Sequence, residues 1–399
     1  MEQLMKQMET VKNDVGMRWE MVRLGDVATF VNGYPFKPTD WGIEGYKIIR
    51  IQNLTNGNSE SNYFSGNIPE KYKVINGDVL ISWSATLDIF VWKGNDAWLN
   101  QHIFKVVFDK IVIDKSYFIY AIKNILDAMR KQVHGATMQH ITKGKFDNLQ
   151  IPLPPLPIQK RIAEILDAAD ALKRKDQALL KKYDELAQAI FIDMFGDPVK
   201  NEKGWEVGSI RDLAHEVKYG TSKPAEDNGL IPYLRMNNLS YSGNWDITNL
   251  KYINLEDDEY DKYVVKKGDL IFNRTNSKEL VGKTAVFDLN MEMAIAGYLI
   301  RLRTNTRGNP YYISGYLNSK HGKKTLLGIC KSIVGMANIN AQELQEIRIM
   351  IPPVNLQNQF EENAKQLKKI VLKTDEQVST SNSLFQALTQ KAFKGELVA

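Results

Sequence analysis

The polar side chains best suited to chemistry gather where predicted strands end, and they occur in two sets. Arginine, asparagine and glutamine form the paired hydrogen bonds that distinguish guanine and adenine edges in the DNA major groove, whereas lysine, serine and threonine suit phosphates. The first set is Arg50, Gln52, Asn53, Ser82, Trp83, Ser84, Asn100, Gln101 and His102. The second set is Arg235, Asn237, Asn238, Asn273, Arg274, Thr275, Asn276 and Lys278. Any one of them alone is more typical of a solvated loop end, but their recurrence at matching places indicates one base-reading surface in each half.

Motifs for catalysis are incomplete. The stretch Gly282-Lys283-Thr284 resembles the end of a phosphate-binding loop, but Ser277 stands where that loop needs a glycine. Asp197, Glu216 and Lys218 imitate a metal-dependent nuclease centre, and an enzyme of that class stays open as an alternative. The histidines are His102, His134, His140, His215 and His321, and their spacing does not fit a metal site. With no glycine-rich cofactor fingerprint and no amino-methyltransferase motif, we expect a chain that does no chemistry and binds no cofactor or metal itself.

The chain contains an internal duplication. The repeated segments are 19–28 with 205–214, 37–38 with 223–224, 49–54 with 234–239, 77–81 with 268–272, and 151–155 with 349–353. The interval grows from 186 residues (19 to 205) to 198 residues (151 to 349). This interval is too long for a solenoid repeat, whose period is roughly 20 to 50 residues, so it indicates two copies of a domain.

Each copy combines short strands with helices. In the first, strands are predicted over 46–51, 79–83 and 103–108, and a helix over 117–133. In the second, strands are predicted over 233–236, 270–273 and 298–302, and helices over 311–317 and 322–329. We therefore predict two α+β domains, each built on a twisted and mostly antiparallel sheet.

A long helix follows each domain. Pro154-Pro155 and Pro352-Pro353 end the domains, and a 4-3 ladder of mostly apolar residues then runs over 158–190 and 356–388. Asp176 and Thr374 are polar rungs that could mark register. We expect an antiparallel pair that holds the domains about one DNA turn apart, roughly 34 to 36 Å. The alternative is that each helix packs only on its own domain.

The bulk composition fits a soluble globular chain. Of the 399 residues 43% are hydrophobic, the net charge is +5 and the pI is about 8.8, which permits a polyanionic partner without requiring one. Cys330 is the single cysteine, which fits a reducing compartment. Because there is no signal peptide and no apolar run of the roughly 20 residues that a membrane span needs, we expect a cytoplasmic protein that contacts no membrane.

Several repeated stretches resemble the specificity (S) subunits of type I restriction–modification systems. They are 19–20, 24–26, 77–80, 149–159, 191–198 and 391–397, and the resemblance extends from Trp19 to Leu397. It implies two target-recognition domains (17–153 and 197–351) in a pseudo-two-fold arrangement. It also implies two spacer helices (154–196 and 352–399) forming an antiparallel coiled coil, with a helical extension over 1–16.

The same resemblance implies partners and a task. Each domain would read one half of a bipartite, interrupted site in double-stranded DNA. The spacer helices would dock two methyltransferase (M) subunits, and restriction/translocase (R) subunits would complete the complex, so that adenines are methylated or unmodified DNA is cut. The partners would use S-adenosylmethionine, ATP and Mg²⁺. Alternatives are the specificity subunit of a type IIB-like modification and cleavage enzyme, or a coiled-coil scaffold without a DNA role.

Overall fold

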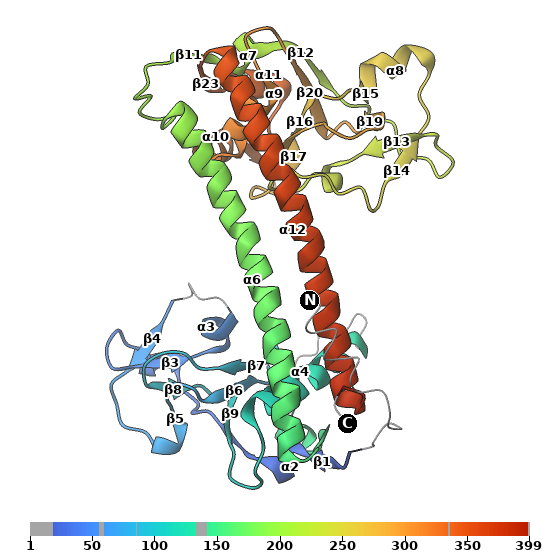
Figure 1. Ribbon diagram of the computed structural model, residues 1–399. Helices are drawn as coiled ribbons and strands as arrows, with labels where there is room; N and C mark the ends of the chain where they lie inside the picture. The colour runs from blue at the N-terminus through green and yellow to red at the C-terminus, as the bar shows by residue number, and fades with distance from the viewer. Residues whose placement is uncertain (1–18, 56–59, 85, 133–141, 334–335, 398–399) are drawn as a thin grey trace. The chain divides into compact units, whose positions relative to one another are not determined.

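The chain forms two compact units. The computed structural model describes residues 19–55, 60–84, 86–132, 142–333 and 336–397 (Figure 1). The first unit consists of residues up to Lys175 together with Val378–Ala399, and the second of Asp176–Gln377. The helix predicted over 1–16 lies outside the described residues.

The described residues of the first unit form ten short strands. They are β1 (Met21–Arg23), β2 (Thr29–Asn32), β3 (Tyr46–Ile49), β4 (Asn62–Phe64), β5 (Lys73–Val74), β6 (Val79–Ser82), β7 (Asp88–Val91), β8 (Ala97–Leu99), β9 (Ile103–Val107) and β10 (Gln150–Pro152). They form one sheet in the order β2-β9-β6-β7, a second in the order β4-β3-β8-β5, and the pair β1-β10. All pairs are antiparallel except β3 with β8.

The second unit repeats this topology. Its strands are β11 (Glu206–Ser209), β12 (Ala214–Tyr219), β13 (Ile231–Leu234), β14 (Lys251–Ile253), β15 (Val264–Val265), β16 (Leu270–Asn273), β17 (Thr275–Asn276), β18 (Thr284–Val286), β19 (Met293–Ile295), β20 (Leu299–Thr304), β21 (Lys331–Ile333), β22 (Met336–Asn338) and β23 (Arg348–Ile351). The sheets β12-β20-β16-β18 and β14-β13-β19-β15 and the pair β11-β23 match those of the first unit strand for strand. A three-stranded sheet, β17-β22-β21, is added. The predicted duplication of a mostly antiparallel α+β domain is confirmed.

The central strands are apolar on both sides because each separates two cores. In β6, Val79 and Ile81 face a core shared with helices, whereas Leu80 faces the second sheet. In β16, Leu270 and Phe272 face the helices and Ile271 faces the second sheet. Side chains alternate between the faces of a strand, so an uninterrupted apolar run is what a strand buried on both faces requires.

The helices differ in length, and in each unit the larger ones pack against the first-named sheet. The short ones are α2 (Leu24–Val27), α3 (Ile51–Thr55), α5 (Lys143–Asp147), α7 (Ile210–Leu213), α8 (Asp257–Tyr263) and α11 (Ala341–Glu346), with 3-10 turns η1 (Pro38–Asp40), η2 (Glu70–Tyr72) and η3 (Met236–Asn238). The larger ones are α4 (Lys115–Gln132), α9 (Pro310–Asn318) and α10 (Lys320–Ile329). The helices predicted over 117–133, 311–317 and 322–329 are confirmed where the structure describes them. Asn309 and Ser319 begin α9 and α10 by accepting main-chain N–H groups, as N-caps do.

Two long helices, α6 (Leu156–Phe195) and α12 (Val354–Lys394), contribute to the core of both units. In the first unit, Ile162 and Leu166 of α6 join Leu388 of α12 in one apolar cluster. In the second unit, Phe191 and Phe360 meet edge to face, with ring centroids 5.7 Å apart. The start of α6 thus meets the end of α12, and the reverse, so the helices contact each other and run antiparallel, as predicted. The alternative that each helix packs only on its own domain is wrong.

The 4-3 ladder is only partly correct. Leu186 and Ile370, both expected as buried rungs, are each 45% exposed. A nearly straight helix drifts by roughly 20° per heptad against a strict seven-residue repeat. Near the end of α6 the buried positions are Phe191 and Phe195, so the buried stripe has moved by one residue from the expected rung at Ile190.

A buried glutamine joins each domain to its helix. Gln159 accepts a hydrogen bond from the Asp114 amide at 2.9 Å and donates to the Pro154 carbonyl at 2.8 Å. Gln357, which is 0% exposed, accepts from the Asn309 amide at 2.9 Å and donates to the Pro352 carbonyl at 2.8 Å. The same device therefore sets the direction in which α6 and α12 leave the proline pairs.

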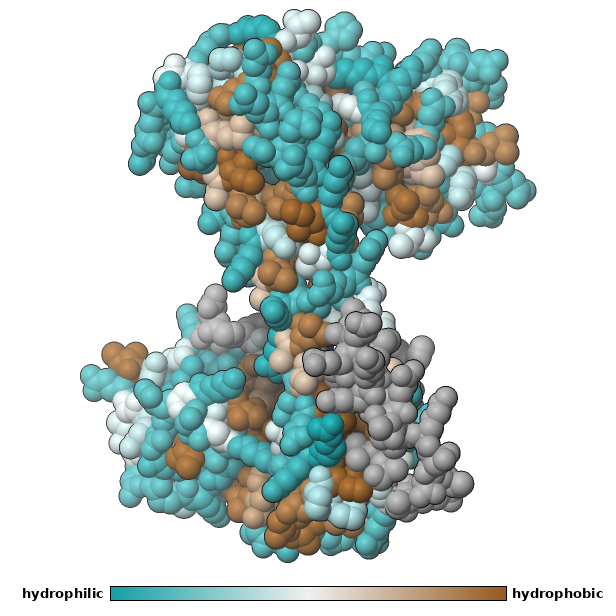
Figure 2. Space-filling view, viewed as in Figure 1, coloured by the Kyte–Doolittle hydropathy of each residue, from teal (hydrophilic) through white to brown (hydrophobic). Residues whose placement is uncertain are grey.

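The surface is predominantly polar. Figure 2 shows hydrophilic side chains over most of the visible face of each unit, with apolar residues in small separate groups. Within the described part of the chain, no helix is long and apolar enough to cross a membrane.

Candidate nucleic-acid interface

The first of the predicted polar segments forms the same turn in both units. The strand expected over 46–51 ends at Ile49, because the Asn53 side chain accepts the Arg50 amide at 3.0 Å and closes a turn. In the second unit the Asn238 side chain accepts the Arg235 amide at 2.9 Å. Asn238 is buried and also donates to the Asp246 carbonyl at 2.9 Å, while Asn53 donates to the Glu60 carbonyl at 3.3 Å. Asn53 and Asn238 therefore stabilise the turn from which the neighbouring polar side chains extend.

The arginines of this turn are also equivalent. Arg50 Nη2 donates to the Glu60 carbonyl at 3.2 Å, and Arg235 Nη2 donates to the Asn249 carbonyl at 3.3 Å. The Arg50 guanidinium additionally lies over the Trp41 ring, with Cζ 5.0 Å from the centroid. Both side chains are partly exposed, and Gln52 and Asn237, two residues further along, are exposed.

The second segment is equivalent as well, although its side chains differ. The Trp83 amide donates to the His102 carbonyl at 3.3 Å, and the Arg274 amide donates to the Tyr298 carbonyl at 3.0 Å. These bonds identify Ser82-Trp83-Ser84 as the counterpart of Asn273-Arg274-Thr275, as the alignment of the repeats predicts. One backbone thus carries an indole in the first unit and a guanidinium in the second.

In the second unit the structure brings both predicted segments to one hollow of about 730 Å³. Arg235, Asn237, Arg274 and Thr275 line it, although some 40 residues separate the two segments along the chain (235 to 274). Residues that the sequence reasoning missed complete the lining: Thr221, Ser222, Lys223, Tyr233, Tyr298 and Asn338 among others. The repeated Lys-Pro pair at 37–38 and 223–224 was the available signal for Lys223.

The other predicted residues of the second unit lie differently. Asn273 is fully buried, and neither Oδ1 nor Nδ2 of its side chain has a hydrogen-bond partner among the described residues. Asn276 accepts the amide of Ser277 at 2.9 Å, which shapes the loop after β17. Lys278 is exposed on that loop.

The first unit presents an aromatic surface instead. Trp83 Nε1 donates to Asn32 Oδ1 at 3.1 Å, and the indole meets His102 edge to face with centroids 5.3 Å apart. Ser82 is buried and bonds the main chain of Asp88, so it closes the β6–β7 hairpin. Ser84 and Gln101 are partly exposed, while Asn100 is 8% exposed.

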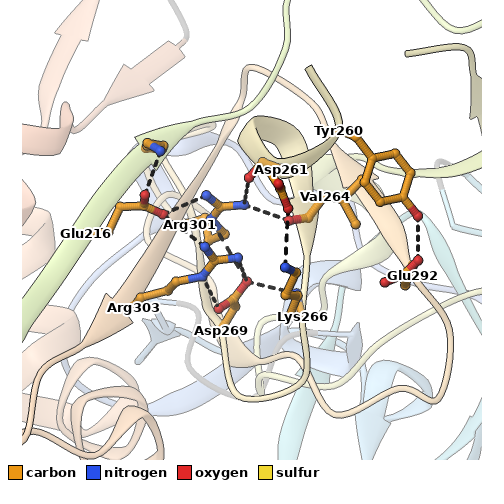
Figure 3. A network of polar contacts seen from close by, with 10 residues as sticks. Glu216, Tyr260, Asp261, Val264, Lys266, Asp269, Glu292, Arg301 and Arg303 are labelled. Carbon is orange, nitrogen blue, oxygen red and sulfur yellow. Dashed lines mark hydrogen bonds and ion pairs between the residues drawn. The ribbon is translucent and has the colours of Figure 1, made fainter. Parts of the chain in front are cut away.

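An ionic network ties together strands of both sheets in the second unit (Figure 3). Arg301 of β20 is fully buried and donates to Glu216 Oε1 of β12 at 2.7 Å and to the Val264 carbonyl of β15 at 2.6 Å. Arg303 Nε donates to Asp269 Oδ1 at 2.9 Å. The network therefore joins the two sheets that carry Arg274 and Arg235. In the first unit a single lysine joins the two sheets: Lys105 Nζ of β9 donates to the Lys73 carbonyl of β5 at 2.6 Å.

The nuclease alternative conflicts with this network. Burial works to raise the pKa of Glu216, but hydrogen bonds from Lys218 and Arg301 outweigh it, and the pKa of this carboxyl lies below its ordinary value. Asp197 accepts the Val199 amide at 2.7 Å within a turn. The described residues contain no group of three histidine, cysteine or acidic side chains placed to hold a metal ion. Glu216 is therefore best understood as a structural anion.

Comparison with known proteins agrees with the duplicated geometry. The family model for the type I restriction modification DNA specificity domain matches residues 17–182 and, a second time, residues 202–382. The chain belongs to this family.

Relatives of the family span nearly the whole chain. The Escherichia coli type I restriction enzyme EcoBI specificity subunit is 25% identical over 418 residues, covering 96% of this chain and 86% of that protein. The Escherichia coli K12 EcoKI specificity subunit is 24% identical over 421 residues, covering 96% and 89%. The structure of a type I restriction-modification S subunit from M. genitalium has the same fold, with a TM-score of 0.58, 14% identity and coverage of 96% and 97%.

Proposed function

We propose that this chain is the DNA-reading, non-catalytic subunit of a type I restriction–modification complex. Each unit reads one half of a bipartite, interrupted site in double-stranded DNA. The observation that carries this proposal is the equivalence of Trp83 and Arg274. Two copies of one backbone present different side chains at the same place, which is what a protein needs to read two different half-sites.

The side chains at other equivalent positions differ in the same way. His102 stands where the second unit has Tyr298, because each directly precedes the strand paired with β6 or β16 and its carbonyl accepts the amide of Trp83 or Arg274. The turns that hold Arg50 and Arg235 are alike in both units. Shared residues fit contacts to the DNA backbone, which position a protein, and differing residues fit contacts to bases, which specify sequence.

The long helices supply the spacing and the docking surface in this proposal. Leu186, Ile370 and Leu372 expose apolar side chains on α6 and α12, which suits helices that bind partner subunits. Two methyltransferase subunits dock there, and restriction/translocase subunits join the complex. The partners use S-adenosylmethionine, ATP and Mg²⁺, and the methyltransferase flips an adenine out of the duplex to methylate it.

A selection experiment tests the proposal. The chain is purified with its cognate methyltransferase subunits, and the complex selects sequences from a pool of random duplexes. We expect two conserved half-sites separated by a fixed number of free positions, and an affinity that falls steeply with salt because phosphate contacts release counterions. Enrichment of no sequence, or salt-insensitive association with DNA, would contradict the proposal.

A further inference from the structure

The backbone of Arg274 is held on both sides. Its amide donates to the Tyr298 carbonyl at 3.0 Å, and its carbonyl accepts the Ile339 amide at 2.9 Å. It connects β16 to β17, and β17 pairs with β22. Strands of two sheets therefore fix the direction in which this side chain leaves the backbone before any ligand binds, which is the preorganisation that a recognition residue requires.

The guanidinium of Arg274 has an aromatic support and free donors. Its Cζ lies 4.8 Å from the centroid of the Tyr219 ring, within the range of a cation–π contact. Tyr219 is itself fixed, because its hydroxyl accepts the Ala341 amide at 2.8 Å. Among the described residues, no carboxylate or carbonyl hydrogen-bonds this guanidinium, which lines the hollow of the second unit. Its Nε is buried without a hydrogen-bond partner among these residues, so the two Nη groups are the oriented donors that are available to a ligand.

The duplication distinguishes a base contact from a phosphate contact. Arg50 and Arg235 occupy equivalent places and donate to main-chain carbonyls. A contact to the DNA backbone serves both half-sites equally and is expected to be shared between the copies. Arg274 is instead replaced by Trp83 in the first unit, so its contact belongs to one half-site alone.

Resting on the function proposed above, we infer that Arg274 reads a guanine in the half-site of the second unit and that Tyr219 positions it. The planar guanidinium matches the O6 and N7 acceptors of guanine in the major groove with two parallel hydrogen bonds. An indole donates through one N–H only, and that of Trp83 already bonds Asn32. The half-site of the first unit therefore has no guanine read from this position.

Sequence selection with the full complex tests the inference. Complexes containing Arg274→Ala or Arg274→Lys are compared with wild type. Arg211→Ala, which removes an exposed arginine of the second unit outside the lining of the hollow, serves as the matched control. We expect Arg274→Ala to weaken binding to the wild-type site by roughly 5- to 150-fold and to equalise the four bases at one position of one half-site. Arg274→Lys keeps the charge but loses the fork, so it loses the same preference with a smaller loss of affinity. Arg211→Ala leaves that position unchanged.

Tyr219 is tested by two substitutions that separate support from packing. Tyr219→Phe keeps the π face but loses the hydrogen bond from the Ala341 amide. We expect it to keep more of the guanine preference than Tyr219→Leu, which removes the π face and weakens the preference at the same position. A simple folding defect would instead reduce affinity without changing which base is preferred. Urea unfolding of each variant is measured alongside.

The outcomes separate this inference from the proposed function. A wild-type complex that enriches no sequence overturns the proposed function, and the inference with it. A wild-type complex that enriches a bipartite site while Arg274→Ala and Arg274→Lys retain every base preference overturns the inference alone. Equal loss at both half-sites, with preferences intact, marks a phosphate contact and also overturns it. Should Arg274→Ala not fold, Arg274→Lys decides.

Discussion

Gln377 Nε2 donates a hydrogen bond to Asp176 Oδ1 across 2.9 Å and so joins α12 to α6 in the middle of both helices. Asp176 is 1% exposed, and its other carboxylate oxygen has no hydrogen-bond partner among the described residues. A buried polar group in a helix pair lowers stability but fixes which residues face each other. The sequence predicted Asp176 as a register marker, and its partner Gln377 is identified by the structure.

Replacing Asp176 tests whether its buried carboxylate lowers the stability of the helix pair while fixing its register. We expect Asp176→Leu to raise the free energy of unfolding by roughly 1 to 3 kcal/mol, because an apolar side chain replaces a buried and half-satisfied carboxylate. Urea unfolding measures the change, and hydrogen exchange along α6 reports whether the helix register has loosened. Glu185→Leu on the exposed face of α6 is the control and should be nearly neutral. A clear loss of stability in Asp176→Leu would show that the carboxylate stabilises the pair.

Matched insertions test the helices as a spacer. Asp176 and Gln377 face each other across the helix pair. Seven residues inserted after Lys175 and seven inserted before Val378 therefore lengthen both helices at the same point and keep them paired. Each helix lengthens by roughly 10 Å. We expect the gap of the recognised site to grow, by at most about three base pairs, while the letters of both half-sites stay the same. Sequence selection measures both properties, and an unchanged gap in a folded complex would contradict the spacer role.

The buried Arg301 is expected to control the stability of the second unit. Arg301→Met leaves Glu216 and Asp269 without their buried partner, and we expect a loss of roughly 3 to 5 kcal/mol. Thermal and urea unfolding measure it. Lys218→Met, at the exposed side of Glu216, is the control and should cost far less. Equal effects of the two substitutions would show that the network is not centred on Arg301.

Lys323 gives the second unit a pH dependence. Burial and the neighbouring Lys283 lower the pKa of Lys323 to about 8, from 10.5. Between these pH values the unfolded chain binds more protons than the folded one, so this group makes stability rise with pH up to about 10.5. We expect Lys323→Met to stabilise the unit at pH 7, by at most roughly 3 kcal/mol, and to gain less as the pH rises above 8. Urea unfolding at pH 7 and pH 10 measures this, and a gain independent of pH would contradict it.

The fold was largely predictable because both copies follow simple periodicities. The apolar run at 270–272 lies in a strand, with Leu270 and Ile271 facing different cores. The prediction that Leu186 is buried was wrong, because a strict seven-residue repeat ignores the gradual rotation of a straight helix relative to that repeat.

The proposed recognition surface was predictable from the sequence only as a set of residues. An asparagine after a strand is equally able to read a base or to close a turn. The side chain of Asn238 accepts the Arg235 amide, which shows that this asparagine closes a turn. The hollow depends on contact between segments near 235 and 274, which no local pattern reveals. Arg301 could not be recognised as a buried anchor, because a charged residue in a strand normally indicates a solvated face.

The most direct test of a two-part DNA reader is the methylation pattern that it directs. The chain is expressed with its cognate methyltransferase in cells lacking other adenine methylation, and the genome is sequenced by a method that detects N6-methyladenine. We predict methylation at one bipartite motif with a fixed gap, and a change in one half of that motif alone for Arg274→Ala. Methylation at a single continuous motif, or at no motif while both proteins are present and folded, would contradict the account.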